Sequence, residues 1–171
     1  MTMIYLSLGS NVERHKHIAA GLDALARMLG ELQISSVYES RAVGFEGSNF
    51  FNLVVGAETV LSIAELSENL KRIEDNNGRK RNGSKFSPRT LDIDILTYGD
   101  FVGIESGIEL PRAEITKNAF VLLPMAEIAP YAKHPQLLQT YAQLWSEYDQ
   151  SSQQLWVIDF MWSGRKISQA Q

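Results

Sequence analysis

Two aspartates, Asp92 and Asp94, lie one residue apart within the apolar run 91–96. Because the side chains of a strand alternate between its two faces, both carboxylates share one face, while Ile93 and Ile95 share the other. Neighbouring carboxylates repel each other and lose hydration against an apolar layer, so they require a cation or water beside them. A hard divalent metal ion meets that need. The pattern therefore predicts a metal site at Asp92 and Asp94.

A strongly basic segment immediately precedes the acid pair. Residues 71–89 carry seven Lys/Arg and two acids, a net charge of +5, so the remainder of this chain of net charge −4 carries −9. A basic island in an acidic chain suits a small polyanion better than a long one. The loop 78–90 is longer than a connector needs to be. Its cations could neutralise phosphate oxygens beside a metal site: Arg79, Arg81, Lys85 and Arg89. Phosphate transfer is the indicated chemistry, and a solvated charged loop beside a structural strand is the alternative.

Other polar residues give weaker signals. Asn52 interrupts the apolar run 50–54, and its amide must find partners, either the backbone or the edge of a heteroaromatic ring. The segment 9–11, Gly-Ser-Asn, is typical of a turn and helix N-cap, and the chain contains no phosphate-binding Gly-x-x-x-x-Gly-Lys-Ser/Thr loop. All three histidines are predicted to lie at the surface: His15, His17 and His134.

The composition bounds the class of protein. The chain has 171 residues, of which 44% are hydrophobic and 21% charged, and it contains no cysteine. These values are typical of a soluble globular protein in a reducing compartment. The first residues lack the features of a secretory signal, and no apolar run approaches the ~20 residues that a membrane span needs. We therefore expect one domain, residues 1–171, as a cytoplasmic monomer without nucleic-acid or membrane partners.

Hydrophobic periodicity predicts the order strand, helix, strand, strand, helix, strand, followed by further helices and a strand. The expected strands are 3–8, 32–38, 50–59, 91–98 and 155–160, and the expected helices are 18–29, 61–75, 120–128 and 137–148. A short hairpin is expected at 102–110 and a polar tail at 168–171. This order is that of ferredoxin-like α+β proteins, with a βαββαβ core in which helices pack on an antiparallel sheet.

Six motifs in this order give the chain a resemblance to the 6-hydroxymethyl-7,8-dihydropterin pyrophosphokinase family. They are Gly9-Ser10-Asn11, Phe51-Asn52, Arg72-Ile73-Glu74, Gly78-Arg79, the run from Pro88 to Ile95, and the run from Ala119 to Pro124. The resemblance covers about residues 3–130, and Pro-Arg-Thr-Leu-Asp-x-Asp is its most specific part. It implies an α/β/α sandwich, with helices on both faces of the sheet. The implied activity is transfer of diphosphate from ATP to the hydroxymethyl group of the pterin, with release of AMP, in folate biosynthesis.

The resemblance also implies a role for each motif residue. Asp92 and Asp94 would bind two Mg²⁺ ions that bridge the phosphates of ATP, and Arg79 and Arg89 would close over the triphosphate as catalytic residues. Asn52 would recognise the amide edge of the pterin. The other implied nucleotide contacts are Glu74, Arg81, Arg112 and Lys117. The other implied pterin contacts are Ser40 and Val43 through their backbone groups, and Phe86 and Phe120 by stacking.

The chain departs from the family pattern at positions near the nucleotide phosphates. Arg112 stands where the family commonly has histidine, and Asn118 stands where it has arginine. Either Arg112 and Lys117, which is next to Asn118, replace those phosphate contacts, or ATP binding is weaker. In addition, Phe86 replaces a tryptophan and Arg41 replaces a proline.

Three alternatives remain from the sequence. A catalytically weakened homologue would bind pterin or nucleotide without forming AMP. A nucleotidyltransferase would use Gly-Ser followed by Asp-x-Asp and release pyrophosphate, but those motifs are usually neighbours, whereas here about 80 residues separate them. A ferredoxin-like RNA binder would carry a basic-aromatic strand signature that this chain lacks.

Overall fold

The computed structural model describes residues 1–41, 48–78 and 90–171. The elements are, in chain order, β1 (Thr2–Ser10), α1 (Arg14–Leu29), β2 (Gln33–Ile34), β3 (Tyr38–Ser40), β4 (Phe50–Thr59), α2 (Ile63–Asn76), β5 (Asp92–Tyr98), β6 (Gly103–Glu105), β7 (Ile108–Leu110), α3 (Glu114–Lys117), α4 (Ala119–Ile128), α5 (Tyr141–Glu147), β8 (Leu155–Val157), β9 (Phe160–Trp162) and β10 (Arg165–Ser168).

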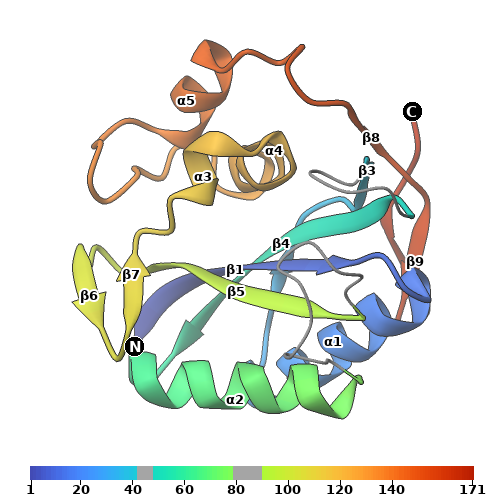
Figure 1. The fold of residues 1–171 in the computed structure, drawn as a ribbon, viewed down its shortest axis with the longest axis horizontal. Helices are drawn as coiled ribbons and strands as arrows, with labels where there is room; N and C mark the ends of the chain where they lie inside the picture. The colour runs from blue at the N-terminus through green and yellow to red at the C-terminus, as the bar shows by residue number, and fades with distance from the viewer. Residues whose placement is uncertain (42–47, 79–89) are drawn as a thin grey trace.

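The described part of the chain is built around a six-stranded sheet in the order β5-β1-β4-β3-β8, with β2 also paired to β4. Every pairing in this sheet is antiparallel. Helices α1 and α2 lie on one side of the sheet, and α3, α4 and α5 lie on the other (Figure 1). The predicted ferredoxin-like α+β fold, an antiparallel sheet with helices on both faces, is therefore confirmed.

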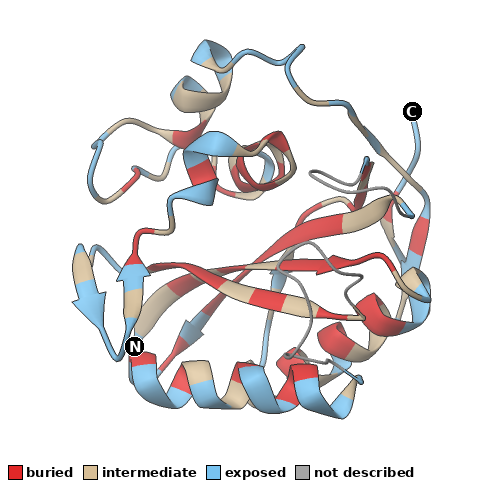
Figure 2. Ribbon diagram, viewed as in Figure 1, coloured by how far each residue is buried: buried red, intermediate tan, exposed pale blue. Residues whose placement is uncertain are grey.

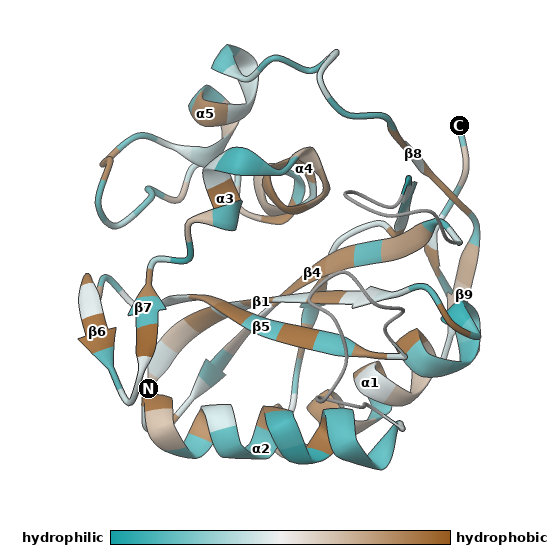
Figure 3. Ribbon diagram, viewed as in Figure 1, coloured by the Kyte–Doolittle hydropathy of each residue, from teal (hydrophilic) through white to brown (hydrophobic). Residues whose placement is uncertain are grey.

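A hydrophobic layer fills the space on each side of the sheet. Strand β4 contributes to both, because its side chains alternate: Leu53 and Val55 pack with α1 and α2, and Val54 packs with α4 and α5. The buried positions lie along the strands and on the helix sides that face them (Figure 2). Helix α4 is apolar over most of its surface (Figure 3), as its sequence AFVLLPMAEI requires of a helix covered on several sides.

Local sequence signals determine where two of the helices begin. At the start of α2, Ser62 Oγ accepts a hydrogen bond from Glu65 N at 3.1 Å, and Glu65 Oε1 accepts one from Ser62 N at 2.9 Å, which is a capping box. Helix α5 begins at Tyr141 rather than at residue 137, because Thr140 caps it by accepting from Gln143 N at 3.1 Å. None of the helices in the described ranges combines the length and apolar character needed to cross a membrane.

The expected strand 32–38 is two short strands, β2 and β3. Ser35 separates them: its Oγ accepts a hydrogen bond from Val54 N at 2.9 Å, and its own N donates to Val54 O at 3.0 Å. The side chain thus takes the place of a backbone partner, and regular pairing stops there. By contrast, β4 has the predicted bounds and β5 begins one residue later than predicted.

The C-terminal prediction needs correction. The expected strand 155–160 is β8 followed by the start of β9, and the expected polar tail begins inside β10, which pairs with β9. Ser168 is buried, where its Oγ accepts from Val37 N at 2.8 Å and donates to Ile158 O at 2.6 Å. The first residue of the predicted polar tail therefore connects the end of the chain to the segment before β3.

The predicted surface location is wrong for two of the three histidines. His17 is 6% exposed, and its Nδ1 lies 2.6 Å from Val12 O. His134 is 5% exposed, and its Nδ1 accepts hydrogen bonds from Gln136 N and Leu137 N at 3.2 and 3.1 Å. Both rings satisfy backbone groups of nearby turns, which explains their burial. His15 is exposed as predicted.

Candidate active site

Two predicted parts of the site meet at Gly9 in β1. In the sheet, Gly9 is the register partner of Asn52 in β4 and of Asp92 in β5. Register partners direct their side chains to the same face, and adjacent strands lie about 4.8 Å apart. Asn52 and Asp92 therefore share one face, with backbones roughly 10 Å apart across a residue that has no side chain. Val54, on the same side of β4 as Asn52, packs in the layer that includes α4, so this face is the one under α4.

The acid pair lies on β5 with the predicted alternation. Ile93 and Ile95 are buried toward α1 and α2, whereas Asp92 and Asp94 are partly exposed on the opposite face. Burial and then the neighbouring Asp92 carboxylate raise the pKa of Asp94 to about 8, although Arg112 opposes this shift. In the absence of a further cation, the pair thus resists carrying two negative charges.

Arg112 is held alongside β5 near Asp94. Its backbone N donates to Leu96 O at 2.9 Å, and its Nε donates to Ile95 O at 3.1 Å. Its Nη2 lies 3.6 Å from Asp94 Oδ1, and its side chain is 30% exposed. A guanidinium fixed in this way can face an acid on one side and an anionic ligand on the other, because it has five donors.

Glu74, a predicted nucleotide contact, lies in the last turn of α2, next to β5. It is 6% exposed, and its Oε2 accepts a hydrogen bond from Ile93 N at 2.7 Å. This bond ties α2 to the backbone between Asp92 and Asp94. The charge of Glu74 also adds to the raised pKa of Asp94. The structure thus shows Glu74 bound to the backbone of the strand that carries Asp92 and Asp94.

The structure brings together Asn52 and Ser40, two predicted pterin contacts. Asn52 Nδ2 donates to Ser40 Oγ at 2.8 Å, and both residues are buried. A Cβ atom on Gly9 would lie 3.0 Å from Asn52 Oδ1, which is tighter than an ordinary van der Waals contact and would require the amide to shift. The glycine of the Gly-Ser-Asn motif therefore leaves space for the Asn52 amide, a role that the sequence alone did not reveal.

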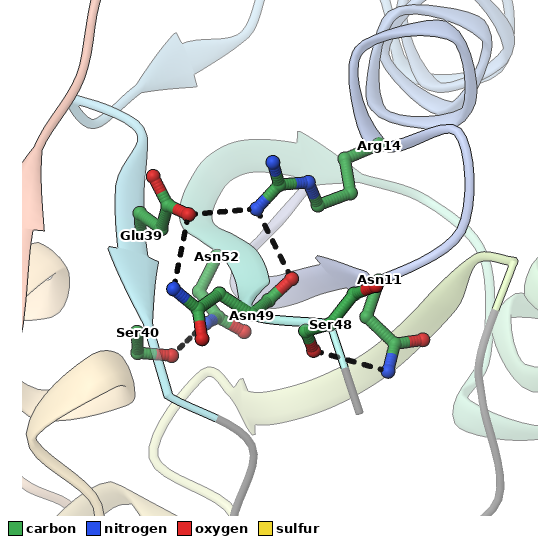
Figure 4. A network of polar contacts seen from close by, with 7 residues as sticks. All are labelled: Asn11, Arg14, Glu39, Ser40, Ser48, Asn49 and Asn52. Carbon is green, nitrogen blue, oxygen red and sulfur yellow. Dashed lines mark hydrogen bonds and ion pairs between the residues drawn. The ribbon is translucent and has the colours of Figure 1, made fainter. Parts of the chain in front are cut away.

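A polar network lies beside these residues (Figure 4). Arg14 Nη1 donates to Glu39 Oε2 at 2.9 Å and to Asn49 O at 3.1 Å, and Asn49 Nδ2 donates to the same Glu39 oxygen at 3.2 Å. The Arg14 guanidinium also lies 4.0 Å above the Phe51 ring. Burial opposes ionisation of Glu39, but the hydrogen bonds from Arg14 and Asn49 outweigh it and lower the pKa of Glu39. The network joins α1, β3 and the residues just before β4, and its members gave no distinctive sequence signal.

Helix α4 brings Phe120 over the end of β3. Glu127, on the same helix, accepts hydrogen bonds from Ser36 N at 3.0 Å and Tyr38 Oη at 2.8 Å, which fixes α4 against this edge of the sheet. A cleft of about 360 Å³ is lined by Ser40, Arg41, Phe120 and residues 151–155. Its size lies within the range of pockets that bind small organic ligands.

Lys117, the last residue of α3, and Asn118 directly precede α4. Lys117 O accepts a hydrogen bond from Tyr148 Oη at 2.8 Å, and its side chain is exposed. Gln153 Oε1 accepts from Ala119 N at 2.8 Å, and its Nε2 donates to Asn118 Oδ1 at 3.3 Å. Sequence reasoning missed Gln153, because a glutamine in a polar segment carries no periodic or motif signal.

Five predicted site residues lie outside the described ranges. They are Val43, Arg79, Arg81, Phe86 and Arg89. Their assignments stay predictions.

Comparison with protein families identifies a match over most of the chain. The model of the 7,8-dihydro-6-hydroxymethylpterin-pyrophosphokinase family matches residues 5–130. A 2-amino-4-hydroxy-6-hydroxymethyldihydropteridine pyrophosphokinase from Aquifex aeolicus is 41% identical over 79% of this chain and 85% of its own length. An enzyme of the same name from Porphyromonas gingivalis is 35% identical over 80% of this chain and 96% of its own length.

Solved structures give the same likeness at the level of the fold. The wild-type HPPK-DHPS of Plasmodium falciparum superimposes with a TM-score of 0.72 over 98% of this chain, at 15% sequence identity. The present chain covers 50% of that longer protein. The matching architecture includes the antiparallel sheet and the helices on its two faces.

Proposed function

The chain belongs to the 7,8-dihydro-6-hydroxymethylpterin-pyrophosphokinase family, and we propose that the row formed by Asn52, Gly9 and Asp92 lies at the centre of its active site. The enzyme is an ATP-dependent diphosphotransferase of folate biosynthesis. It transfers diphosphate from ATP to the hydroxymethyl group of 6-hydroxymethyl-7,8-dihydropterin and releases AMP.

The shared register partner, Gly9, is the observation that carries this assignment. It puts an amide suited to a heteroaromatic ring and a carboxylate suited to a metal on one face, on strands whose backbones are roughly 10 Å apart. A pterin held at Asn52 can thus direct its hydroxymethyl group toward phosphates held near Asp92. The cleft at Ser40 and Phe120 lies at the Asn52 side of this row, where the pterin ring would stack on Phe120.

Asp92 and Asp94 are the residues that would hold Mg²⁺, and their chemistry fits the ion. They supply oxygen ligands on one face, and the pKa of Asp94 is raised first by burial and then by the charge of Asp92, both of which a bound cation would oppose. Mg²⁺ is commonly held by one or two carboxylates together with substrate phosphates. Two bound Mg²⁺ ions would neutralise the phosphate oxygens of ATP. Glu74 supports the pair by fixing the backbone of Ile93 between the two acids.

The protein's own groups orient the reactants and supply further positive charge. Asn52 and Phe120 hold the pterin, whose hydroxymethyl oxygen attacks the β-phosphorus in line while AMP departs as the leaving group. Arg112 contributes its positive charge beside Asp94, and Arg79 and Arg89 are assigned by their motif to the triphosphate. Holding the attacking oxygen and the phosphorus in line supplies much of the rate enhancement.

The remaining nucleotide and pterin contacts are proposed from the family pattern. Arg81, Lys117 and Glu74 are assigned to the nucleotide side, and Val43 and Phe86 to the pterin side. A single domain over residues 1–171, a monomeric state and a cytoplasmic location are further proposals. The single-domain proposal is supported by the two hydrophobic layers, because both pack against the same central sheet.

Product analysis with two substrates tests this proposal. The chain is incubated with Mg²⁺ and ATP, with and without the pterin alcohol, and the nucleotides are separated by chromatography. AMP should form only when the pterin is present. The substitutions Asp92→Asn and Asp94→Asn should each lower the rate at least ~100-fold, because a metal ligand is worth several kcal/mol at a phosphoryl centre.

Asp100 is exposed and lies two residues after the end of β5. The variant Asp100→Asn is therefore the matched control and should retain activity. ADP as the product, or pterin binding by calorimetry without AMP formation, would contradict the assigned reaction. Unchanged rates in both aspartate variants would contradict the metal assignment.

A further inference from the structure

Residues 131–171 lie beyond the part of the chain that the family model matches, yet they reach the cleft assigned to the pterin. After α5 the chain descends toward the sheet and joins it as β8 (Figure 1). There Leu155 is the register partner of Ser40. Residues 151–155 therefore form one wall of the cleft, and Ser40 and Phe120 contribute the rest of its described lining together with Arg41.

Gln153 connects this wall to the start of α4. Its Oε1 accepts a hydrogen bond from Ala119 N at 2.8 Å. Its Nε2 lies 3.3 Å from Asn118 Oδ1 and 3.4 Å from Lys117 O. Tyr148 adds a second connection from the same region, through its hydroxyl group to Lys117 O at 2.8 Å. Three consecutive residues before Phe120 are thus held by side chains from the C-terminal segment.

The bond to Ala119 N matters because this amide opens a helix. The first N–H groups of a helix lack partners within it, and the Asn118 side chain makes no capping hydrogen bond. Gln153 supplies the missing acceptor. Because Phe120 directly follows Ala119, the position of the first turn of α4 determines where the Phe120 ring stands in the cleft.

We propose that Gln153 is a positioning residue for the pterin. Residues 151–155, which lie beyond the part of the chain matched by the family model, form one wall of the pterin cleft. The inference rests on the proposed function, because it takes Phe120 and Ser40 as pterin contacts. Gln153 acts through Ala119 and Phe120. Its shortest bond, 2.8 Å, holds the amide directly before Phe120. It reaches Lys117, a proposed nucleotide contact, only through the main-chain oxygen at 3.4 Å, so loss of Gln153 should affect the pterin more than the nucleotide.

The test compares Gln153→Ala, Gln153→Glu and the wild-type enzyme in steady-state assays of AMP formation. A tenfold change in affinity corresponds to about 1.4 kcal/mol, which is of the order of one hydrogen bond. Gln153→Ala should thus raise the KM for the pterin about tenfold while the KM for ATP changes less than about twofold. Gln153→Glu retains the acceptor for Ala119 N but loses the donor to Asn118 Oδ1, so its pterin KM should lie between those of the wild type and Gln153→Ala.

Gln150→Ala is the matched control. Gln150 is an exposed glutamine of the same segment that bonds Trp145 O at 3.2 Å and does not line the cleft. Thermal unfolding of each variant, and calorimetric titration with the pterin in the absence of ATP, provide readouts independent of turnover.

Two outcomes would overturn the inference. One is an unchanged pterin KM and Kd in Gln153→Ala. The other is a parallel loss of pterin affinity, ATP affinity and thermal stability, because a merely structural bond would produce it. If the wild-type enzyme forms no AMP, the proposed function fails, whereas the pterin titrations of the variants still decide the role of Gln153.

Discussion

Asn52 and Asp92 are joined by a single intervening residue of the sheet, Gly9, which pairs with both. The two side chains lie on the same face because antiparallel partners point to the same side. Their backbones are separated by two strand spacings, roughly 10 Å. A rigid sheet thus sets the distance between the proposed ring site and the proposed metal site.

The absence of a side chain at Gly9 is the first feature open to test. In Gly9→Ala, the new Cβ would lie 3.0 Å from Asn52 Oδ1 and would shift the amide by a few tenths of an ångström. The KM for the pterin should rise about tenfold, because an amide hydrogen bond to the ring would be lost or misaligned.

A double-mutant cycle with Asn52 tests whether the loss of pterin affinity in Gly9→Ala arises from displacement of the Asn52 amide. If Gly9→Ala acts through Asn52, then adding it to Asn52→Ala should produce little further loss. Pterin Kd values measured by calorimetry for the four proteins give the interaction free energy. Fully additive losses would show that Gly9 affects pterin binding by another route.

The acid pair predicts a conflict between stability and activity. In the metal-free protein, the pKa of Asp94 is raised to about 8, first by burial and then by Asp92. Between about pH 4 and 8, the unfolded chain then binds fewer protons than the folded one, so the free energy of unfolding falls as the pH rises. Asp94→Asn removes this ionisation and should stabilise the metal-free protein at pH 7 while abolishing AMP formation.

The expected stabilisation is modest because the Asp94 side chain is 33% exposed and solvent screens its charge. We expect about 1 kcal/mol, or a Tm increase of ~2–4 °C for a chain of this size. Thermal unfolding from pH 4 to 8 in the presence of a chelator measures it. The difference between the two proteins should grow with pH, and a constant or inverted difference would contradict the assigned burial of charge.

The sequence predicts those features of the site that depend on local pattern. The alternation around Ile93 places both aspartates on one face, and the apolar run 50–59 predicts β4 with its observed bounds. Register is different. That Gly9 faces both Asn52 and Asp92 depends on how three strands align, and separate sequence segments do not contain that alignment.

Polar residues whose partners are distant in sequence were the hardest to place. Ser35 and Ser168 each satisfy backbone groups of another segment, so that one divides a predicted strand and the other fastens a predicted tail. Gln153 is similar, because its partners lie more than thirty residues earlier in the chain. Local pattern predicted a continuous strand at Ser35 and a polar tail at Ser168 and gave no signal at Gln153, whereas tertiary hydrogen bonding determined the structure at all three.

Arg112 is predicted from the resemblance to supply positive charge to the phosphates of ATP in place of a histidine. Its guanidinium lies 3.6 Å from Asp94 and is oriented by the bond from Nε to Ile95 O. Arg112→Ala should raise the KM for ATP about tenfold at low ionic strength and less at high salt, because a partly exposed charge is screened. Arg112→His should lose less than Arg112→Ala, since its imidazole can still donate a hydrogen bond to a phosphate oxygen.

The exposed Arg165→Ala, in β10, is the matched control for the loss of one positive charge. Initial rates of AMP formation at several salt concentrations give the KM for ATP in each protein. An ATP KM for Arg112→Ala that equals that of Arg165→Ala would restrict Arg112 to its contacts with β5. The phosphate charge would then have to be balanced by Lys117 and by the arginines of the Pro-Arg-Thr-Leu-Asp-x-Asp and Gly-Arg motifs, and substitution of those residues would become the decisive measurement.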